Sequence, residues 1–117
     1  MDIEYFREYG LRKKGVTEGF PFGEDVIVFK VMNKIFMMID FETPFSINLK
    51  CDPELAVELR EKYESVNAGY HMNKKHWNTV IADGSIPVNE IKKMIDHSYE
   101  IVAEGLPQKL KKELGKL

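Results

Sequence analysis

Two apolar runs separated by three residues constrain the fold more than any other feature of this sequence. Residues 26–31 are rich in β-branched side chains, and residues 35–39 form a second apolar run. Such side chains favour the extended backbone of a strand. Asn33, in the middle of the three intervening residues, tolerates the positive φ that a tight turn needs. The pattern predicts a β-hairpin and therefore at least one antiparallel pair of strands.

Further strands are predicted on both sides of this hairpin. Residues 17–23 indicate a short edge strand punctuated by turn residues. Residues 45–50 alternate apolar and polar side chains, which is typical of a strand with one buried face. The expected core face carries Phe45, Ile47 and Leu49, and the expected opposite face carries Ser46, Asn48 and Lys50. Residues 66–72 and 77–82 predict two more strands around a loop centred on residues 73–75.

Helix start and stop signals frame these strands. Asp2 can cap a first helix of about a dozen residues. The run Asp52-Pro53-Glu54 supplies a cap, a proline at the first helical position and a carboxylate near the positive end of the helix dipole. Pro87 opens a long helix that ends near Gly105 and Pro107. A short basic helix is expected to finish the chain.

The predicted order is one helix, three or four strands, a helix, two strands and a helix, followed by the short basic one. Strands joined by hairpins and flanked by helices indicate an α+β fold, in which helices cover one side of an antiparallel sheet. With 117 residues, of which 44% are hydrophobic and 31% charged, the chain is expected to form a single domain over residues 1–117.

Cysteine usage and hydropathy indicate where such a protein works. Cys51 is the only cysteine, so the chain can form no internal disulfide, which excludes the disulfide-rich secreted class. The N-terminal residues lack the apolar run of a signal peptide, and no stretch approaches the roughly 20 apolar residues that cross a bilayer. We therefore expect a cytoplasmic protein that does not interact with a membrane.

The formal net charge is −2, but positive charge is concentrated locally. The clusters are Arg12-Lys13-Lys14, Lys74-Lys75, and a tail with Lys109, Lys111, Lys112 and Lys116. Basic patches on an acidic body are compatible with nucleic-acid binding, and a solvated face without a partner is the alternative.

No motif of a known catalytic or cofactor site occurs in the chain. P-loop, dinucleotide-binding, zinc-protease and serine-hydrolase patterns are all missing. Cys51 lies between a predicted strand and a helix start, but a small buried residue is the better interpretation than a nucleophile. His71 and His76 would face each other across a hairpin loop, where a cross-strand contact is favoured over metal binding. We expect no enzymatic activity, no cofactor and no metal.

The stretch at residues 70–78 combines aromatic, basic and amide side chains. Lys74 and Lys75 would lie at the tip of the loop. Trp77 is either a core residue of a small domain or a surface on which bases stack while ammonium groups meet phosphates. Two lysines neutralise only about two phosphates, so useful affinity would also need Lys34, Lys50, the tail or a second subunit.

The same nine residues, YHMNKKHWN, resemble the signature of the MmcQ/YjbR family of small bacterial proteins. The resemblance extends to residues 15–18, 20–23, 28–31, 49–53 and 98–99, and to Lys34 and Phe36. It implies a fold similar to the type III secretion chaperones and the YjbR-like group, ordered α-β-β-β-α-β-β-α. Asn33 departs from the glycine expected in the hairpin turn, although asparagine adopts the same backbone conformation.

The resemblance also implies a function, because the family is described as DNA-binding through a double wing of β-hairpin loops. One wing would comprise His71, Asn73, Lys74, Lys75, His76 and Asn78, and Lys34 would belong to the other. In this hypothesis the lysines touch phosphates, while His71, His76, Trp77 and Asn78 shape the loop or meet bases.

A non-enzymatic protein-interaction module is the alternative hypothesis. The fold would then present a sheet or helix surface to a peptide or to another copy of the chain. Met37-Met38 is expected to be exposed at the end of a strand, where flexible methionine side chains suit adaptable contacts.

Overall fold

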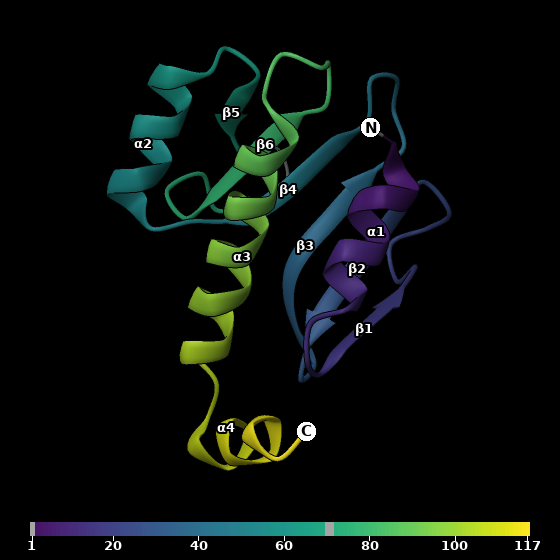
Figure 1. Ribbon diagram of the computed structural model, residues 1–117, viewed down its shortest axis with the longest axis vertical. Coiled ribbons are helices and arrows are strands. Elements are labelled where there is room, and N and C mark those ends of the chain that lie inside the picture. Colours follow the sequence, from purple (N-terminus) through teal and green to yellow (C-terminus); the bar gives the residue numbers. More distant parts are fainter. Residues whose placement is uncertain (1, 70–71) are drawn as a thin grey trace.

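The predicted hairpin forms β2 (Val26–Val31) and β3 (Lys34–Asp40) of the computed structural model, which describes residues 2–69 and 72–117 (Figure 1). The turn between them comprises Met32 and Asn33, with φ of 46° and 72°. Two central residues with positive φ are the pattern of a type I′ turn, whose twist matches that of the flanking strands. The positive φ expected at Asn33 is therefore confirmed, and Met32 adopts one as well.

The hairpin is part of a six-stranded sheet with the strand order β1-β2-β3-β4-β6-β5. The other strands are β1 (Val16–Gly19), β4 (Ser46–Lys50), β5 (Val66–Ala68) and β6 (Trp77–Ile81). Each described pair of neighbouring strands is antiparallel. Because β6 lies between β4 and β5, Lys50 at the end of β4 is opposite Trp77 at the start of β6.

Helices cover one side of this sheet, as expected. They are α1 (Ile3–Leu11), α2 (Pro53–Lys62) and α3 (Val88–Glu104), whereas the last helix, α4 (Gln108–Gly115), lies beyond the end of the sheet (Figure 1). The long α3 crosses β3 and β4, α2 packs beside β5 and β6, and α1 lies against β1 and α3 (Figure 1). Both predicted caps are confirmed, because Asp2 accepts from the backbone N–H of Tyr5 and Asp52 from those of Glu54 and Leu55. No helix in the described part of the chain is long and apolar enough to cross a membrane.

Ser98 joins α3 to the middle of the sheet. This fully buried hydroxyl donates to the carbonyl of Phe36 at 2.5 Å and accepts from the backbone N–H of Lys50 at 2.9 Å. The hydrogen bonds are made inside the core, where an unpaired polar group would cost free energy. The largest fully buried side chains of the described residues include Phe6, Phe29, Phe36, Met37, Ile39, Ile47, Leu49, Ile91 and Ile95.

The structure corrects three expectations. The single buried face expected for residues 45–50 is wrong, because Asn48 lies on the face opposite Leu49, as predicted, yet is only 3% exposed and accepts a 2.6 Å hydrogen bond from Thr79 on β6. The prediction that Met37 and Met38 are exposed is wrong, because Met37 is fully buried and Met38 is 4% exposed in the middle of the sheet. The strand expected at residues 66–72 is shorter, since β5 ends at Ala68.

The element order agrees with the pattern read from the sequence in having four strands before α2 and a short basic helix at the end. It contains one strand and one helix more than the order implied by the family resemblance.

Candidate functional site

The connection from β5 to β6 contains the stretch that the sequence singled out. Residues 70 and 71 lie outside the described part of the chain, and so does the predicted contact of His71 with His76. Residues 72–76, here called the basic loop, are described and lead directly into β6.

A local turn shapes the basic loop. The Asn73 side-chain oxygen accepts from the backbone N–H of Lys75 at 2.9 Å, and its carbonyl accepts from that of His76 at 3.1 Å. Asparagine commonly stabilises turns in this way. The side chains of Lys74 and Lys75 are exposed, and neither ammonium forms an ion pair with any residue the structure describes. The two positive charges therefore face solvent.

Arg60, on α2, holds the base of the basic loop. Its Nε donates to the Asn78 side-chain oxygen at 2.7 Å, and its Nη2 donates to the carbonyls of Lys74 and, at 3.3 Å, Trp77. The planar guanidinium suits such a cluster of acceptors because its N–H groups are fixed in one plane. No motif in the sequence marks Arg60 as part of the site. The spacing from Ala56 is the one feature of the sequence that indicates where Arg60 points. Residues four apart lie on the same face of a helix, and Ala56 is fully buried.

Two further backbone contacts fix the ends of the loop. The N–H of Gly69 donates to the carbonyl of Trp77 at 2.7 Å, and the N–H of Cys51 donates to the carbonyl of His76 at 2.7 Å. A Cβ on Gly69 would lie 2.7 Å from the Cβ of Trp77, so only glycine allows the chain to pass this close. The loop is thus attached to α2, to the end of β4 and to the end of β5.

Trp77 and Asn78 are buried at the start of β6. The indole is 7% exposed, which fits the core interpretation and leaves no free ring face for stacking. Asn78 is 2% exposed, and its side chain is engaged by Arg60 and by a 3.4 Å hydrogen bond to the Ala56 carbonyl. Both residues shape the loop from below, and in this structure neither presents its side chain to a base.

The two remaining predicted contact residues lie in different places. Lys50 is half-buried beside the loop, opposite Trp77, and it forms no ion pair with a described residue. Lys34 is exposed at the β2–β3 turn, and β4 lies between its strand, β3, and the strand β6 that follows the basic loop. The structure therefore brings Lys50, but not Lys34, to the basic loop.

Lys34 has other basic neighbours. A Cβ built on Gly15 would contact both Met32, in the β2–β3 turn, and Leu114 of α4, so the terminal helix packs beside that turn. We call Lys34 and the exposed lysines of the tail the basic end. Its members are Lys34, Lys109, Lys112 and Lys116.

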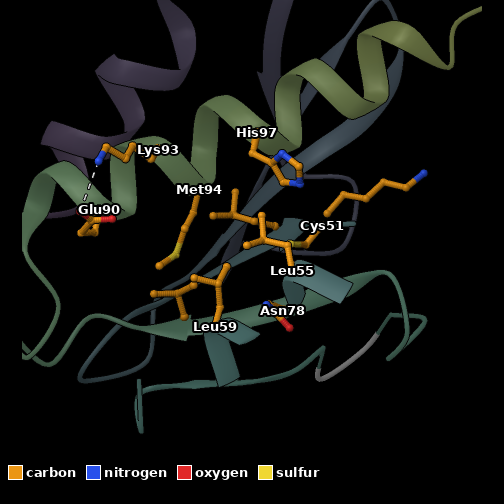
Figure 2. A pocket seen from close by; sticks show the side chains of 11 residues that line it. Cys51, Leu55, Leu59, Asn78, Glu90, Lys93, Met94 and His97 are labelled. Atoms are coloured by element: carbon orange, nitrogen blue, oxygen red, sulfur yellow. Dashed lines mark hydrogen bonds and ion pairs between the residues drawn. The ribbon is translucent and has the colours of Figure 1, made fainter. Parts of the chain in front are cut away.

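A cavity of about 210 Å³ lies between α2 and α3, over β4 and β6 (Figure 2). No pattern in the sequence predicts this cavity. The residues that line it are Leu49, Lys50, Cys51, Leu55, Leu59, Asn78, Val80, Glu90, Lys93, Met94 and His97. It shares Lys50 and Asn78 with the surroundings of the basic loop.

The residues that line the cavity include a thiol, on Cys51, and an imidazole, on His97. Cys51 is 5% exposed, and burial, reinforced by the neighbouring carboxylate of Asp52, raises its thiol pKa to about 11. The thiol therefore remains protonated at neutral pH, as expected of a small buried residue. His97 Nε2 accepts a hydrogen bond from the backbone N–H of Asp52 at 3.2 Å. In the described residues, no three His, Cys, Asp or Glu side chains gather closely enough to hold a metal ion.

The chain matches known proteins over most of its length. The family model YjbR matches residues 11–101. The uncharacterized protein YjbR of Escherichia coli K12 is 33% identical over 118 residues, covering 100% of both chains. The uncharacterized protein YbdF of Escherichia coli O157:H7 is 38% identical over 96 residues, covering 80% of this chain and 78% of its own.

Solved structures agree in fold. The crystal structure of Deinococcus radiodurans protein DR2400, with the domain DUF419, superimposes with a TM-score of 0.89 at 35% identity and covers 97% of this chain and 87% of that one. A Pseudomonas syringae protein reaches a TM-score of 0.75 at 28% identity, covering 86% of this chain and 98% of its own. With the family model matching most of its length, this chain belongs to the YjbR family.

Proposed function

We propose that this protein binds DNA and that the basic loop is a wing that contacts the phosphate backbone. One observation carries the proposal: Lys74 and Lys75 are exposed and lack acidic partners among the described residues, on a loop whose backbone is held by Arg60. A fixed loop presents its two ammonium groups without first losing conformational freedom, which favours binding. Lys50 adds a third positive charge at the same edge of the sheet.

The expected contact is electrostatic rather than sequence-specific. Since Trp77 and Asn78 are buried, the exposed groups of the loop are the Asn73 amide and two ammonium groups, which suit phosphate oxygens. Each neutralised phosphate contributes about −0.9 to the slope of log K against log salt concentration for duplex DNA. The loop lysines together should therefore account for a slope of about −2.

Fluorescence anisotropy with a labelled duplex, measured over a series of salt concentrations, tests this proposal. The double variant Lys74→Ala/Lys75→Ala should bind more weakly, and its slope should be smaller by about 2. The control variant Lys62→Ala/Lys93→Ala removes the same charge from exposed positions on α2 and α3. An unchanged affinity and slope in the loop variant, or an equal loss in the control, contradicts the proposal.

A second function, self-association, is favoured by a separate observation. Phe20, Phe22 and Phe41 are 53%, 66% and 37% exposed, and the rings of Phe20 and Phe41 pack edge to face with centroids 6.5 Å apart. Neighbouring exposed apolar side chains are a common mark of a protein interface. We call Phe20, Phe22 and Phe41 the aromatic surface. In the interaction hypothesis these residues take the role expected of Met37 and Met38, which are buried.

Light scattering coupled to gel filtration would measure self-association. A dimer that is lost in Phe22→Ser/Phe41→Ser supports this second function, whereas a chain that stays monomeric as its concentration is raised contradicts it. DNA binding by the monomer would leave the first proposal intact.

A further inference from the structure

The gap between α2 and α3 leaves apolar side chains incompletely covered. Each helix packs on the sheet, but the two helices contact each other far less than either contacts its strands. Leu55 and Leu59 of α2 are only half-buried and face the cavity, and Met94 faces it from α3 (Figure 2). Leu49 and Val80 form the floor on β4 and β6. The cavity is therefore apolar on both helices and on the sheet.

Polar side chains around the cavity already have partners within the protein. Asn78 is engaged through both its oxygen and its nitrogen, by Arg60 and by the Ala56 carbonyl. His97 Nε2 accepts from the backbone N–H of Asp52. A ligand hydroxyl inside the cavity would find few free partners, and a buried hydroxyl without a hydrogen bond costs free energy.

The charged groups around the cavity favour neither sign of ligand. Glu90 and Lys93 pair with each other at 3.4 Å, so their charges offset each other (Figure 2). Lys50 lies at the edge of the cavity, but its side chain leaves β4 on the face opposite Leu49, because side chains alternate along a strand. Burial raises the pKa of the Cys51 thiol, which stays protonated at neutral pH. Within the part of the chain that the structure describes, no unpaired charge therefore points into the cavity.

We propose that this cavity binds a small neutral apolar molecule, held between Leu55 and Leu59 of α2 and Met94 of α3. Binding would remove the apolar surface of both the ligand and the cavity from water. The volume of about 210 Å³ sets the size of the ligand. Because an engineered apolar cavity of about 150 Å³ holds benzene, a single aromatic ring with a short alkyl substituent fits here. The cavity is separate from the exposed lysines of the basic loop, so the proposal does not depend on DNA binding.

Titration of the isotope-labelled protein with toluene, followed by NMR, tests the proposal. Resonances of Leu55, Leu59 and Met94 should shift, with a Kd of about 1 mM or below, as expected for a ligand of this size. Nuclear Overhauser contacts should connect the toluene ring with the same side chains.

Three further ligands test the preference for a neutral apolar molecule. Benzoate and benzylammonium keep the aromatic ring and carry opposite charges, so each should bind at least about tenfold more weakly than toluene. Phenol has a hydroxyl in place of the methyl group, and it should bind at least about fivefold more weakly, because the cavity offers that hydroxyl few partners.

Two variants of α2 locate the site. Leu55→Trp should fill the cavity and weaken toluene binding at least about tenfold. Val57→Trp introduces the same side chain at a position of the helix that is 47% exposed, and it should leave binding unchanged. The Overhauser contacts in the wild-type protein locate the ligand without any substitution, so the proposal remains testable if Leu55→Trp does not fold.

Three outcomes overturn the proposal. The first is the absence of shifts at Leu55, Leu59 and Met94 up to the solubility limit of toluene. The second is binding of benzoate, benzylammonium or phenol as tight as that of toluene, which would remove the case for a neutral apolar ligand. The third is toluene whose contacts lie at other residues, or whose binding a folded Leu55→Trp leaves unchanged, because the ligand would then lie elsewhere.

Discussion

Arg60 shows how one side chain on α2 determines the shape of a loop that follows it by more than ten residues. Its guanidinium satisfies the side-chain oxygen of Asn78 and the carbonyls of Lys74 and Trp77. Without it, the nearly fully buried Asn78 oxygen would lose its charged donor. Leaving a buried polar group unpaired costs about 1–3 kcal/mol.

Arg60→Ala should therefore lower the free energy of unfolding by about 1–3 kcal/mol and speed amide hydrogen exchange in the basic loop. Arg60→Lys should recover only part of this loss, because an ammonium cannot reproduce the planar fork of donors. Urea unfolding and hydrogen exchange measure the two effects. If Arg60→Ala behaves like Lys62→Ala, a neighbour that makes no such contacts with the loop, then Arg60 does not position it.

Cys51 gives a pH-dependent prediction. Its pKa is raised from 9.0 to about 11 by burial, so the folded state binds its proton more tightly than the unfolded state. The contribution of this thiol to the free energy of unfolding is fully present below about pH 9 and is lost as the pH rises through about 11. The protonated thiol stabilises the folded state by an amount on the order of 1–3 kcal/mol. This stabilisation is lost at alkaline pH because the thiol ionises there.

The stability of the wild type should therefore fall more steeply between about pH 8.5 and pH 11 than that of Cys51→Ala. Urea unfolding of both proteins across this range measures the difference. The comparison cancels the titration of lysines and tyrosines, which the two chains share. Parallel pH profiles would mean that the thiol is not desolvated in the fold.

At the scale of elements, the β2–β3 hairpin is defined by its turn. Met32 and Asn33 both adopt positive φ, which costs a non-glycine residue about 1 kcal/mol or more, although asparagine tolerates it better than most. The turn also matters for the basic end, because Lys34 is the first residue after it and α4 packs against Met32.

Asn33→Gly should leave the stability unchanged or raise it slightly, whereas Asn33→Val should lower it by about 1–2 kcal/mol. Chemical denaturation measures both changes. Thr17→Val, at an exposed position in the neighbouring edge strand, controls for the general effect of introducing valine. A valine variant at position 33 as stable as the wild type would contradict the positive φ there.

At the scale of the whole molecule, a net charge of −2 conceals two separated basic surfaces. The basic loop lies beside α2, and the basic end lies where α4 meets the β2–β3 turn (Figure 1). Exposed carboxylates instead follow the aromatic residues in the chain, with Glu24 and Asp25 shortly after Phe22 and Glu42 directly after Phe41. This separation limits how the protein can be oriented on a polyanion.

The basic end should add to DNA binding if a duplex reaches both surfaces. Lys34→Ala/Lys109→Ala/Lys112→Ala, combined with the two loop substitutions, should then reduce the salt slope by up to about 3 beyond the loop variant alone. The same anisotropy titration measures this change. A slope no smaller than that of the loop variant would restrict the DNA contact to the basic loop.

The sequence by itself determined the elements, because their signals are local. Alternation, the residues of the β2–β3 turn and the caps at Asp2 and Asp52 depend on neighbours a few positions away, and the structure confirms them. The position of the basic loop could also be read from the chain. The burial of Asn48 and Met38 could not, because it depends on the strands that lie beside them in the sheet.

Only the tertiary structure decided how the candidate sites are built. Insertion of β6 between β4 and β5 brings Lys50 and Cys51 to the basic loop, and it places Trp77 in the core instead of on the surface. Packing of α2 and α3 on that part of the sheet creates both the Arg60 contacts and the apolar cavity. These features join residues far apart in the chain, and neither residue pattern nor charge indicates in advance which of them will meet.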